Sequence, residues 1–315
     1  MTPALKIDHL NKYFGKKQIL HDISLETYPG EVFGFLGPNG AGKTTTIKIA
    51  VGLLRLDEGS ILIDGKSIAK DFEGAMRNVG GIVENPELYK YMSGIKNLRQ
   101  YARMRGGISE ARIQEVVELV GLKNRINGKV GKYSLGMRQR IGVAQAILHK
   151  PKLLILDEPT NGLDPAGIKE LRDILKNLAH KEKICVIVSS HLMSEMELMC
   201  DRVGIIVNGK LKGVQTVEEM ISASAGNDSS YILRVSNCEA AVDLLNFIGK
   251  DKKKIQDDKH IQISIPKANE EELLFDITDR LISSGIRLGT VAPVENKKLE
   301  DVFIELTKSG GSQIA

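Results

Sequence analysis

The chain has 315 residues, of which 42% are hydrophobic, and its 44 Lys and Arg residues against 40 Asp and Glu residues leave a net charge of +4. This length predicts about two domains with ordinary hydrophobic cores. The charge is mixed and there is no Trp, whereas a nucleic-acid partner favours a basic surface with stacking aromatic residues. The composition therefore argues against a nucleic-acid partner.

Apolar runs in the chain are too short to cross a membrane. The runs at 153–156 and 184–188 have the length of strands, whereas a membrane-spanning helix needs roughly 18 apolar residues. The N-terminus has no apolar signal core, so we expect the chain to stay in the cytoplasm. The three cysteines, Cys185, Cys200 and Cys238, include no Cys-x-x-Cys pair and are expected to be buried, reduced thiols.

Residues 1–220 are predicted to form an α/β domain. Alternating apolar residues predict early antiparallel strands, and a change to helical periodicity predicts a helical subdomain at about 86–150 that includes a helix capped by Ser109. Later apolar strands are continuous, which is typical of a sheet covered by helices on both faces. The predicted strands are 4–9, 18–25, a hairpin at 59–66, 153–156, 184–188 and 203–207.

A small, polar stretch at 221–230 is predicted to be a linker. Residues 231–315 are then expected to form a small accessory α+β domain without a catalytic cluster. One helix in it is expected to be capped by Asn269, with Glu272 three residues later, and to end at Gly285. The predicted elements are strand 231–236, helix 238–249, a hairpin with Ile261, Ile263 and Ile265 on one face, helix 270–284, strand 286–292 and helix 298–308.

A phosphate-binding loop is the most informative motif. Residues 37–45 have the pattern Gly-x-x-x-x-Gly-Lys-Thr, between a short apolar strand at 32–36 and a helix at 44–54. Glycines let backbone N–H groups approach phosphate oxygens, and the helix N-terminus attracts the same anion. Lys43 is expected to reach the β- and γ-phosphates, and Thr44 to bind Mg²⁺. The nucleotide-binding residues predicted here are Gly37, Pro38, Asn39, Gly40, Ala41, Gly42, Lys43, Thr44 and Thr45.

Two carboxylates end the apolar strand at 153–156. Asp157 suits contact with the Mg²⁺ that Thr44 holds, and Glu158 suits the role of a general base for an attacking water. An Asp-Glu pair that merely ends a strand before Pro159 is an equally good interpretation of these two residues taken alone.

Three further segments add to the pattern. Ser134 opens an amphipathic helix, either as an anion site or as an ordinary N-cap. Residues 161–164 follow the acidic strand, and His191 follows the next strand, where open α/β sheets bind ligands.

In this order, over residues 4–215, the motifs resemble those of the nucleotide-binding subunit of ATP-binding-cassette (ABC) transporters. The resemblance implies that 37–45 is the Walker A motif, 153–157 the Walker B motif, Glu158 the catalytic carboxylate and His191 the switch histidine. Residues 161–164 resemble the D-loop.

The family's signature motif resembles residues 134–139, so Ser134 and Gly136 are expected to contact the γ-phosphate of ATP held by a partner subunit. Met137 stands in it where a polar residue is usual. Phe14 matches the aromatic residue that stacks on adenine, although Tyr13 is an alternative and Phe14 could equally be a core side chain.

Glu84 replaces the family's glutamine that links magnesium to the permease. Its surroundings, Glu-x-Pro-x-Leu-Tyr, and the trailing domain are similar to the bacitracin-resistance and lantibiotic-immunity exporters of bacteria. The carboxylate of Glu84 is either an extra Mg²⁺ ligand or a tolerated variant.

The resemblance implies an ATPase that binds ATP and Mg²⁺, forms a head-to-tail dimer and drives a separate membrane permease for antimicrobial peptides. Such a subunit is peripheral on the cytoplasmic face of the membrane. The alternatives are a soluble ABC-type ATPase, an exporter of another substrate, and a P-loop GTPase or kinase. The last is disfavoured because the chain has no Asn-Lys-x-Asp sequence.

Overall fold

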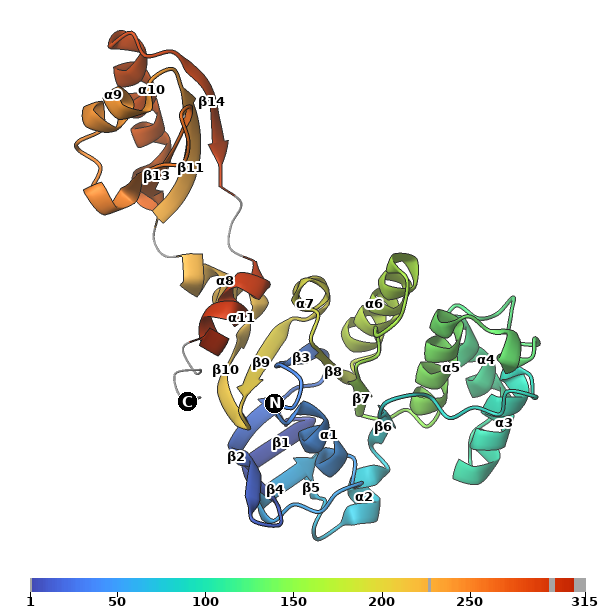
Figure 1. The fold of residues 1–315 in the computed structure, drawn as a ribbon. Helices are drawn as coiled ribbons and strands as arrows, with labels where there is room; N and C mark the ends of the chain where they lie inside the picture. The colour runs from blue at the N-terminus through green and yellow to red at the C-terminus, as the bar shows by residue number, and fades with distance from the viewer. Residues whose placement is uncertain (1, 226–227, 295–297, 309–315) are drawn as a thin grey trace. The chain divides into compact units, whose positions relative to one another are not determined.

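The computed structural model describes residues 2–225, 228–294 and 298–308 (Figure 1). The chain divides into two compact units. One consists of Met1–Val217 with Phe303–Ala315, and the other is Glu218–Val302. Within the described residues, no helix combines the length and the apolar character that crossing a membrane requires.

The first unit is built on a six-stranded sheet with the order β10-β9-β3-β8-β7-β6. Its strands are parallel except for β10, which pairs antiparallel with β9. Every residue of β3, β7 and β8 is buried, which confirms the prediction of a sheet covered on both faces. The strands are β3 (Val32–Leu36), β6 (Val79–Ile82), β7 (Leu153–Asp157), β8 (Cys185–Ser190), β9 (Arg202–Val207) and β10 (Lys210–Thr216).

A second, antiparallel sheet with the order β2-β1-β4-β5 shares one hydrophobic core with β3 and with α1 (Lys43–Ala50). Leu10 and Leu20 from this sheet and Ile49 from α1 are fully buried in that core. The strands are β1 (Leu5–Phe14), β2 (Lys17–Thr27), β4 (Glu58–Ile63) and β5 (Lys66–Ser67).

Two predicted boundaries in this region are wrong. β1 was predicted to end at residue 9 but continues to Phe14. At that point His9 has a left-handed φ of 50°, and the pairing with β2 shifts register after Ile7. These irregularities interrupt the alternation on which the prediction depended. The helix predicted at 44–54 ends at Ala50.

The predicted helical subdomain is present at 94–147, and Ser109 accepts a hydrogen bond from the Arg112 N–H as the expected N-cap. Figure 1 shows its helices side by side, away from the antiparallel sheet. It contains α3 (Gly94–Arg105), α4 (Glu110–Leu119), η1 (Val130–Lys132) and α5 (Leu135–Ile147). The other helices of the first unit are α2 (Phe72–Met76), α6 (Pro165–His180) and α7 (Met193–Met199). Two further helices, α8 (Val217–Ala225) and α11 (Leu299–Lys308), lie at the two places where the chain passes between the units.

The second unit has the strand and helix order βαββαβ, with an antiparallel sheet β12-β13-β11-β14. Ile261, Ile263 and Ile265 are all buried on one face, as predicted, and share a core with Ile277 and Leu281. Its elements are β11 (Asp228–Val235), α9 (Cys238–Leu244), η2 (Lys250–Lys252), β12 (Lys253–Ile255), β13 (His260–Pro266), η3 (Lys267–Asn269), α10 (Glu270–Ser283) and β14 (Leu288–Pro293).

The predicted linker at 221–230 is largely structured, since α8 continues to Ala225 and β11 begins at Asp228. Residues 226 and 227 lie outside the described residues. The predicted accessory domain also ends too late, because the chain from Phe303 belongs to the first unit. Asn269 makes no side-chain cap, since a 3-10 turn runs directly into α10. The three cysteines are free and buried, as expected.

Candidate nucleotide site

The phosphate loop joins the carboxyl end of β3 to the N-terminus of α1. Gly40 and Gly42 have left-handed φ angles of 79° and 112°, which glycine adopts at no steric cost. A Cβ at Gly42 would lie 2.5 Å from Leu20 Cδ2, and a Cβ at Gly37 would clash with the carbonyl oxygen of Ile206. Packing against β2 and β9 therefore requires glycine at both ends of the loop.

Lys43 is the first residue of α1, and its side chain is buried. Its Nζ donates to the carbonyl oxygens of Gly37, at 2.6 Å, and Pro38, at 3.3 Å. Burial lowers the pKa of the Lys43 ammonium, and the nearby carboxylates of Glu158 and Asp157 oppose that shift. The lysine is thus held inside the loop beside acceptors that phosphate oxygens can replace.

Asp157 ends β7 directly beside Ser189 of β8, its partner in the parallel register. Its Oδ1 accepts hydrogen bonds from Ser189 Oγ at 2.5 Å and from Thr44 Oγ1 at 3.4 Å. A hydroxyl and a carboxylate are ligands suited to Mg²⁺, which usually takes only one or two protein groups beside substrate phosphates. Thr44 and Asp157 could therefore hold this cation. No cluster of three or more His, Cys, Asp or Glu suited to a metal occurs among the described residues.

Glu158 follows β7 and has a left-handed φ of 49°. Its backbone N–H donates to Ser189 Oγ at 3.0 Å. The carboxylate has Oε1 3.7 Å from Lys43 Nζ and Oε2 2.8 Å from His191 Nδ1. A carboxylate that is oriented from two sides beside a phosphate loop is well placed to act as a general base.

A cavity of about 260 Å³ brings most of the predicted residues together. His191 and Glu158 lie in its wall, although they follow different strands. Asn161 also lines it. Of the predicted site residues near it, Gly37 and Asp157 do not line it. The remaining lining residues are the rest of the loop: Pro38, Asn39, Gly40, Ala41, Gly42, Lys43, Thr44 and Thr45.

Ser134 and Gly136 do not line this cavity. Ser134 caps α5, and its Oγ accepts a hydrogen bond from the Met137 N–H at 3.2 Å. Within one chain Ser134 is therefore an ordinary N-cap, which was one of the two interpretations of the sequence. The N–H groups at the start of α5 are unpaired by the helix itself.

Glu84 and Phe14 also lie outside the cavity lining. Glu84 Oε1 pairs with Lys48 Nζ at 3.1 Å, one helical turn beyond Thr44 on α1. Phe14 lies at the end of β1 and is 51% exposed, so it is not a core side chain; Tyr13 beside it is 36% exposed.

Ser189 is a residue of the candidate site that the sequence did not reveal. Its fully buried hydroxyl donates to Asp157 and accepts from the Glu158 N–H. The only signal in the sequence was its place at the end of an apolar strand, two residues before His191.

The fold and this site define a P-loop nucleoside triphosphatase. The site has a phosphate loop, a carboxylate suited to bind a metal ion and a second carboxylate suited to accept a proton from a water molecule. Residues 20–161 match the ABC transporter family. Together with the relatives described next, this match shows that the chain belongs to that family: it is the ATP-binding subunit of a transporter and an ATPase.

Two relatives come from the genus Bacillus. The chain is 48% identical over 307 residues to the uncharacterized ABC transporter ATP-binding protein YhcH of Bacillus subtilis (strain 168), covering 98% of this chain and 97% of the relative. It is 44% identical over 211 residues to the bacitracin transport ATP-binding protein BcrA of Bacillus licheniformis, with coverages of 67% and 69%.

A third relative is the lantibiotic transport ATP-binding protein SrtF of Streptococcus pyogenes, 41% identical over 224 residues, with coverages of 69% and 96%. A solved structure described as the ATP binding subunit of an ABC transporter is 31% identical, has a TM-score of 0.62 and covers 70% of this chain and 92% of its own. These similarities confirm the family that the motifs predicted.

Proposed function

We propose that this subunit hydrolyses Mg·ATP in a site shared with a second ATPase subunit and drives a separate permease that exports antimicrobial peptides. The observation that carries the hydrolytic part is the Glu158 carboxylate, which His191 and Lys43 orient beside the phosphate loop. The relatives' names, bacitracin transport and lantibiotic transport, support the class of substrate.

In the proposed mechanism, N–H groups of the loop bind the phosphates, and Lys43 exchanges its two carbonyl acceptors for phosphate oxygens. Glu158 accepts the proton of the attacking water, and His191 keeps the carboxylate in position. Thr44 and Asp157 would hold Mg²⁺, which neutralises phosphate charge when bound. Glu84 would act on this metal only if its carboxylate left Lys48.

The second subunit would supply Ser134 and Gly136. The start of α5 carries N–H groups that the helix itself does not pair, of which that of Met137 donates to Ser134 Oγ, and the positive end of a helix of 13 residues, which suits it to the γ-phosphate. Since neither residue lines the cavity of its own chain, we propose that α5 completes the site of a partner, in a homodimer or a heterodimer.

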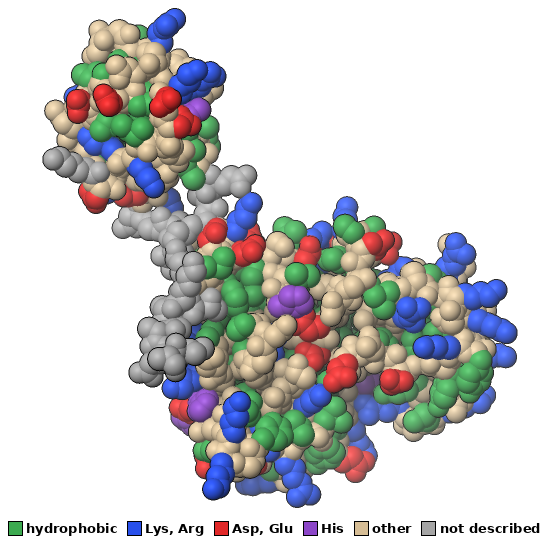
Figure 2. Space-filling view, in the orientation of Figure 1, with side chains coloured by type: hydrophobic (Ala, Val, Ile, Leu, Met, Phe, Trp, Pro, Cys, Tyr) green, Lys and Arg blue, Asp and Glu red, His purple; other side chains and the backbone are tan. Residues whose placement is uncertain are grey.

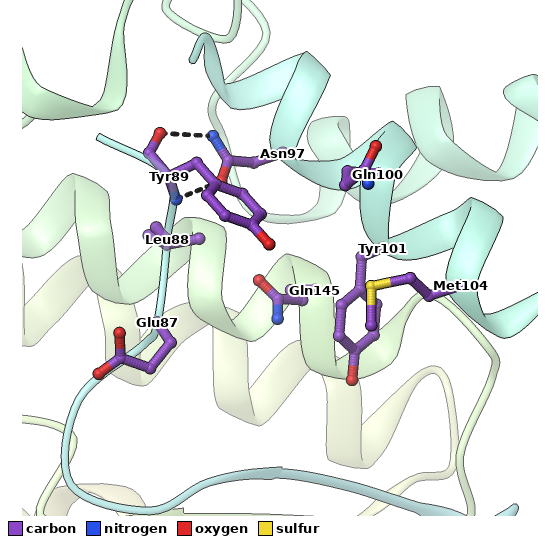
Figure 3. Close-up of a pocket in the computed structure, with 8 residues that line it drawn as sticks. All are labelled: Glu87, Leu88, Tyr89, Asn97, Gln100, Tyr101, Met104 and Gln145. Carbon is purple, nitrogen blue, oxygen red and sulfur yellow. Dashed lines mark hydrogen bonds between the residues drawn. The ribbon is translucent and has the colours of Figure 1, made fainter. Parts of the chain in front are cut away.

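The permease would dock on the helical subdomain. Figure 3 shows a pocket between the segment that follows Glu84 and helices α3 and α5, with Tyr89, Tyr101 and Gln145 around it. Its volume is about 340 Å³. Asn97 holds the segment to α3 by accepting from the Tyr89 N–H at 2.8 Å and donating to the Tyr89 carbonyl at 3.1 Å.

Large apolar side chains around this pocket are unusually exposed. Tyr89 and Met104, which line the pocket, are 48% and 74% exposed, and Tyr91, whose ring lies 5.9 Å from that of Tyr89, is 69% exposed. Such surface favours a protein contact. The face of the first unit seen in Figure 2 carries apolar and basic side chains at the helical subdomain. These basic side chains suit a position near anionic headgroups, so we place the subunit at the cytoplasmic membrane face.

Affinity purification of the tagged chain from native membranes tests the transport part. The proposal predicts one polytopic permease in a stoichiometric complex, and loss of this complex in Tyr89→Asp or Met104→Asp but not in Leu198→Asp, which places the same charge at an exposed leucine of α7 outside the pocket. Co-purification without any membrane protein would contradict the proposed contact with a permease.

A further inference from the structure

Lys12 is a buried lysine next to the predicted adenine-binding residue Phe14. It lies on β1 and is only 8% exposed. Its Nζ lies 3.0 Å from Asp57 Oδ1 and 5.5 Å from the centroid of the Phe14 ring. That distance lies within the range of cation–π attraction, which extends to about 6 Å.

Asp57 fixes this arrangement from the other side. While Oδ1 accepts from Lys12, Oδ2 accepts from the backbone N–H of Tyr13 at 2.6 Å. These hydrogen bonds, the one from Tyr13 foremost, lower the pKa of Asp57, so its carboxylate is charged at neutral pH. One side chain therefore holds both the ammonium beside the ring and the backbone that carries the ring.

We propose that Lys12, held by Asp57, positions Phe14 for the adenine base by occupying one side of its ring and leaving the exposed side free for stacking. This inference rests on the adenine role of Phe14. A cation over one face draws electron density of the ring toward itself, so the opposite face repels the electron-rich face of a purine less. Lys12 thus strengthens base stacking without touching the nucleotide.

A purely structural role makes a different prediction. Asp57 lies just before β4, so the pair could act only as a clamp between β1 and β4. Loss of a clamp lowers the free energy of unfolding and weakens every ligand of the site alike. Loss of a positioning residue weakens only ligands that carry a base, and only while Phe14 is present.

The experiment measures binding of ADP and of pyrophosphate, which lacks the base, to the purified full chain and its variants. Lys12→Met is expected to weaken ADP binding about two- to fivefold and to leave pyrophosphate binding unchanged. Lys12→Arg, which keeps the charge, should restore the parent affinity. If Lys12→Met folds poorly in thermal unfolding, Lys12→Gln replaces it, with the same expected loss.

The decisive comparison uses Phe14→Ala. In that background Lys12→Met should no longer change ADP affinity, since the ring through which it acts is gone. Lys6→Met is the control. Lys6 lies on β1, as Lys12 does, and its Nζ pairs with the Glu26 carboxylate of β2 at 2.8 Å. This variant should leave ADP affinity unchanged.

Two results would overturn the inference. If Lys12→Met weakens ADP binding as much with Ala at position 14 as with Phe, Lys12 does not act through the ring, whereas the adenine role of Phe14 stands if Phe14→Ala itself weakens only ADP. If Phe14→Ala leaves ADP affinity unchanged, the adenine role fails and the inference with it.

Discussion

Nδ1 of His191 lies 2.8 Å from Oε2 of Glu158, although 33 positions separate the two residues in the chain. An ionised carboxylate only accepts hydrogen bonds, so Nδ1 carries the hydrogen and donates it. In the neutral ring this leaves Nε2 as an acceptor. His191 therefore both orients the proposed base and presents a second polar atom at the cavity that it lines.

Ser189→Ala should impair catalysis more than folding. The substitution removes the hydroxyl that bonds Asp157 and the Glu158 N–H. Without this hydroxyl, Asp157 and the backbone of Glu158 lose the partner that positions them, so kcat should fall about ten- to a hundredfold, and half-maximal activity should need more Mg²⁺. Steady-state phosphate release at varied Mg²⁺ measures both effects.

Ser190→Ala is the matched control for that variant. Ser190 is the next residue of β8 and equally buried, but its hydroxyl accepts from the Leu192 N–H instead. If the two variants showed the same activity and Mg²⁺ dependence, the role of Ser189 at Asp157 would be wrong.

The role of Ser189 shows where sequence reasoning stopped. The phosphate loop and the pair Asp157 and Glu158 could be predicted because each motif is contiguous and ends an apolar strand. Ser189 acts through its register with Asp157 in a neighbouring strand, and strand register is set by the whole sheet. The Glu84–Lys48 pair is likewise a contact between distant segments.

The fold was predictable where the periodicity was regular. Four strands of the six-stranded sheet, β3, β7, β8 and β9, and the helical subdomain follow from continuous apolar runs and helical spacing. β6, which contains two glycines, and the partly exposed β10 carry no such run and were not predicted. β1 was predicted too short because His9 breaks the alternation with a left-handed backbone. The linker prediction missed α8 because it depended on the small, polar composition of residues 221–230. Three of the first five residues favour or tolerate a helix, however: Ile221, Ala223 and Ala225.

Glu84→Gln tests the remaining metal assignment. If the carboxylate leaves Lys48 to help hold the metal, the variant should need more Mg²⁺ for half-maximal hydrolysis, at an unchanged maximal rate. Lys48→Met should then have the opposite effect, because it frees the carboxylate. If Mg²⁺ dependence is the same in both variants and in the parent, Glu84 is not a metal residue.

His149 should make the protein less stable as the pH falls. Its Nε2 lies 2.9 Å from the Val79 carbonyl oxygen, and burial lowers the pKa of His149 to about 4. Since the unfolded chain takes up this proton near pH 6.5 and the folded chain only near pH 4, the free energy of unfolding should fall through that window as pH decreases. Urea unfolding at pH 7 and pH 5 should show a smaller loss in His149→Gln.

His9→Gln should show the opposite sign. His9 is exposed, and its hydrogen bond from Nδ1 to Asp22 raises its pKa, so its contribution is present at low pH and lost as pH rises. This variant should lose more stability than the parent on going from pH 7 to pH 5.

Identical pH profiles for the parent and His149→Gln would contradict the account of His149.

The shared site predicts complementation between two inactive variants. Lys43→Ala lacks the phosphate lysine and Ser134→Arg blocks the start of α5, so each should be inactive alone. Mixed together they can form one intact composite site, and hydrolysis should return if one site can turn over.

The specific activity of the parent should also rise with protein concentration, as association requires. Full activity in a protein shown to be monomeric during turnover would contradict the dimer.

The most direct test of the central claim, that Glu158 is the general base, is the turnover of Glu158→Gln. This substitution keeps the side-chain size and the phosphate loop but removes the proton acceptor that lies 2.8 Å from His191. Calorimetry should give an ATP affinity close to that of the parent, and phosphate release in a single turnover should be slower by about 10²–10⁴-fold. Release near the parent rate, with ATP bound equally well, would contradict the assignment.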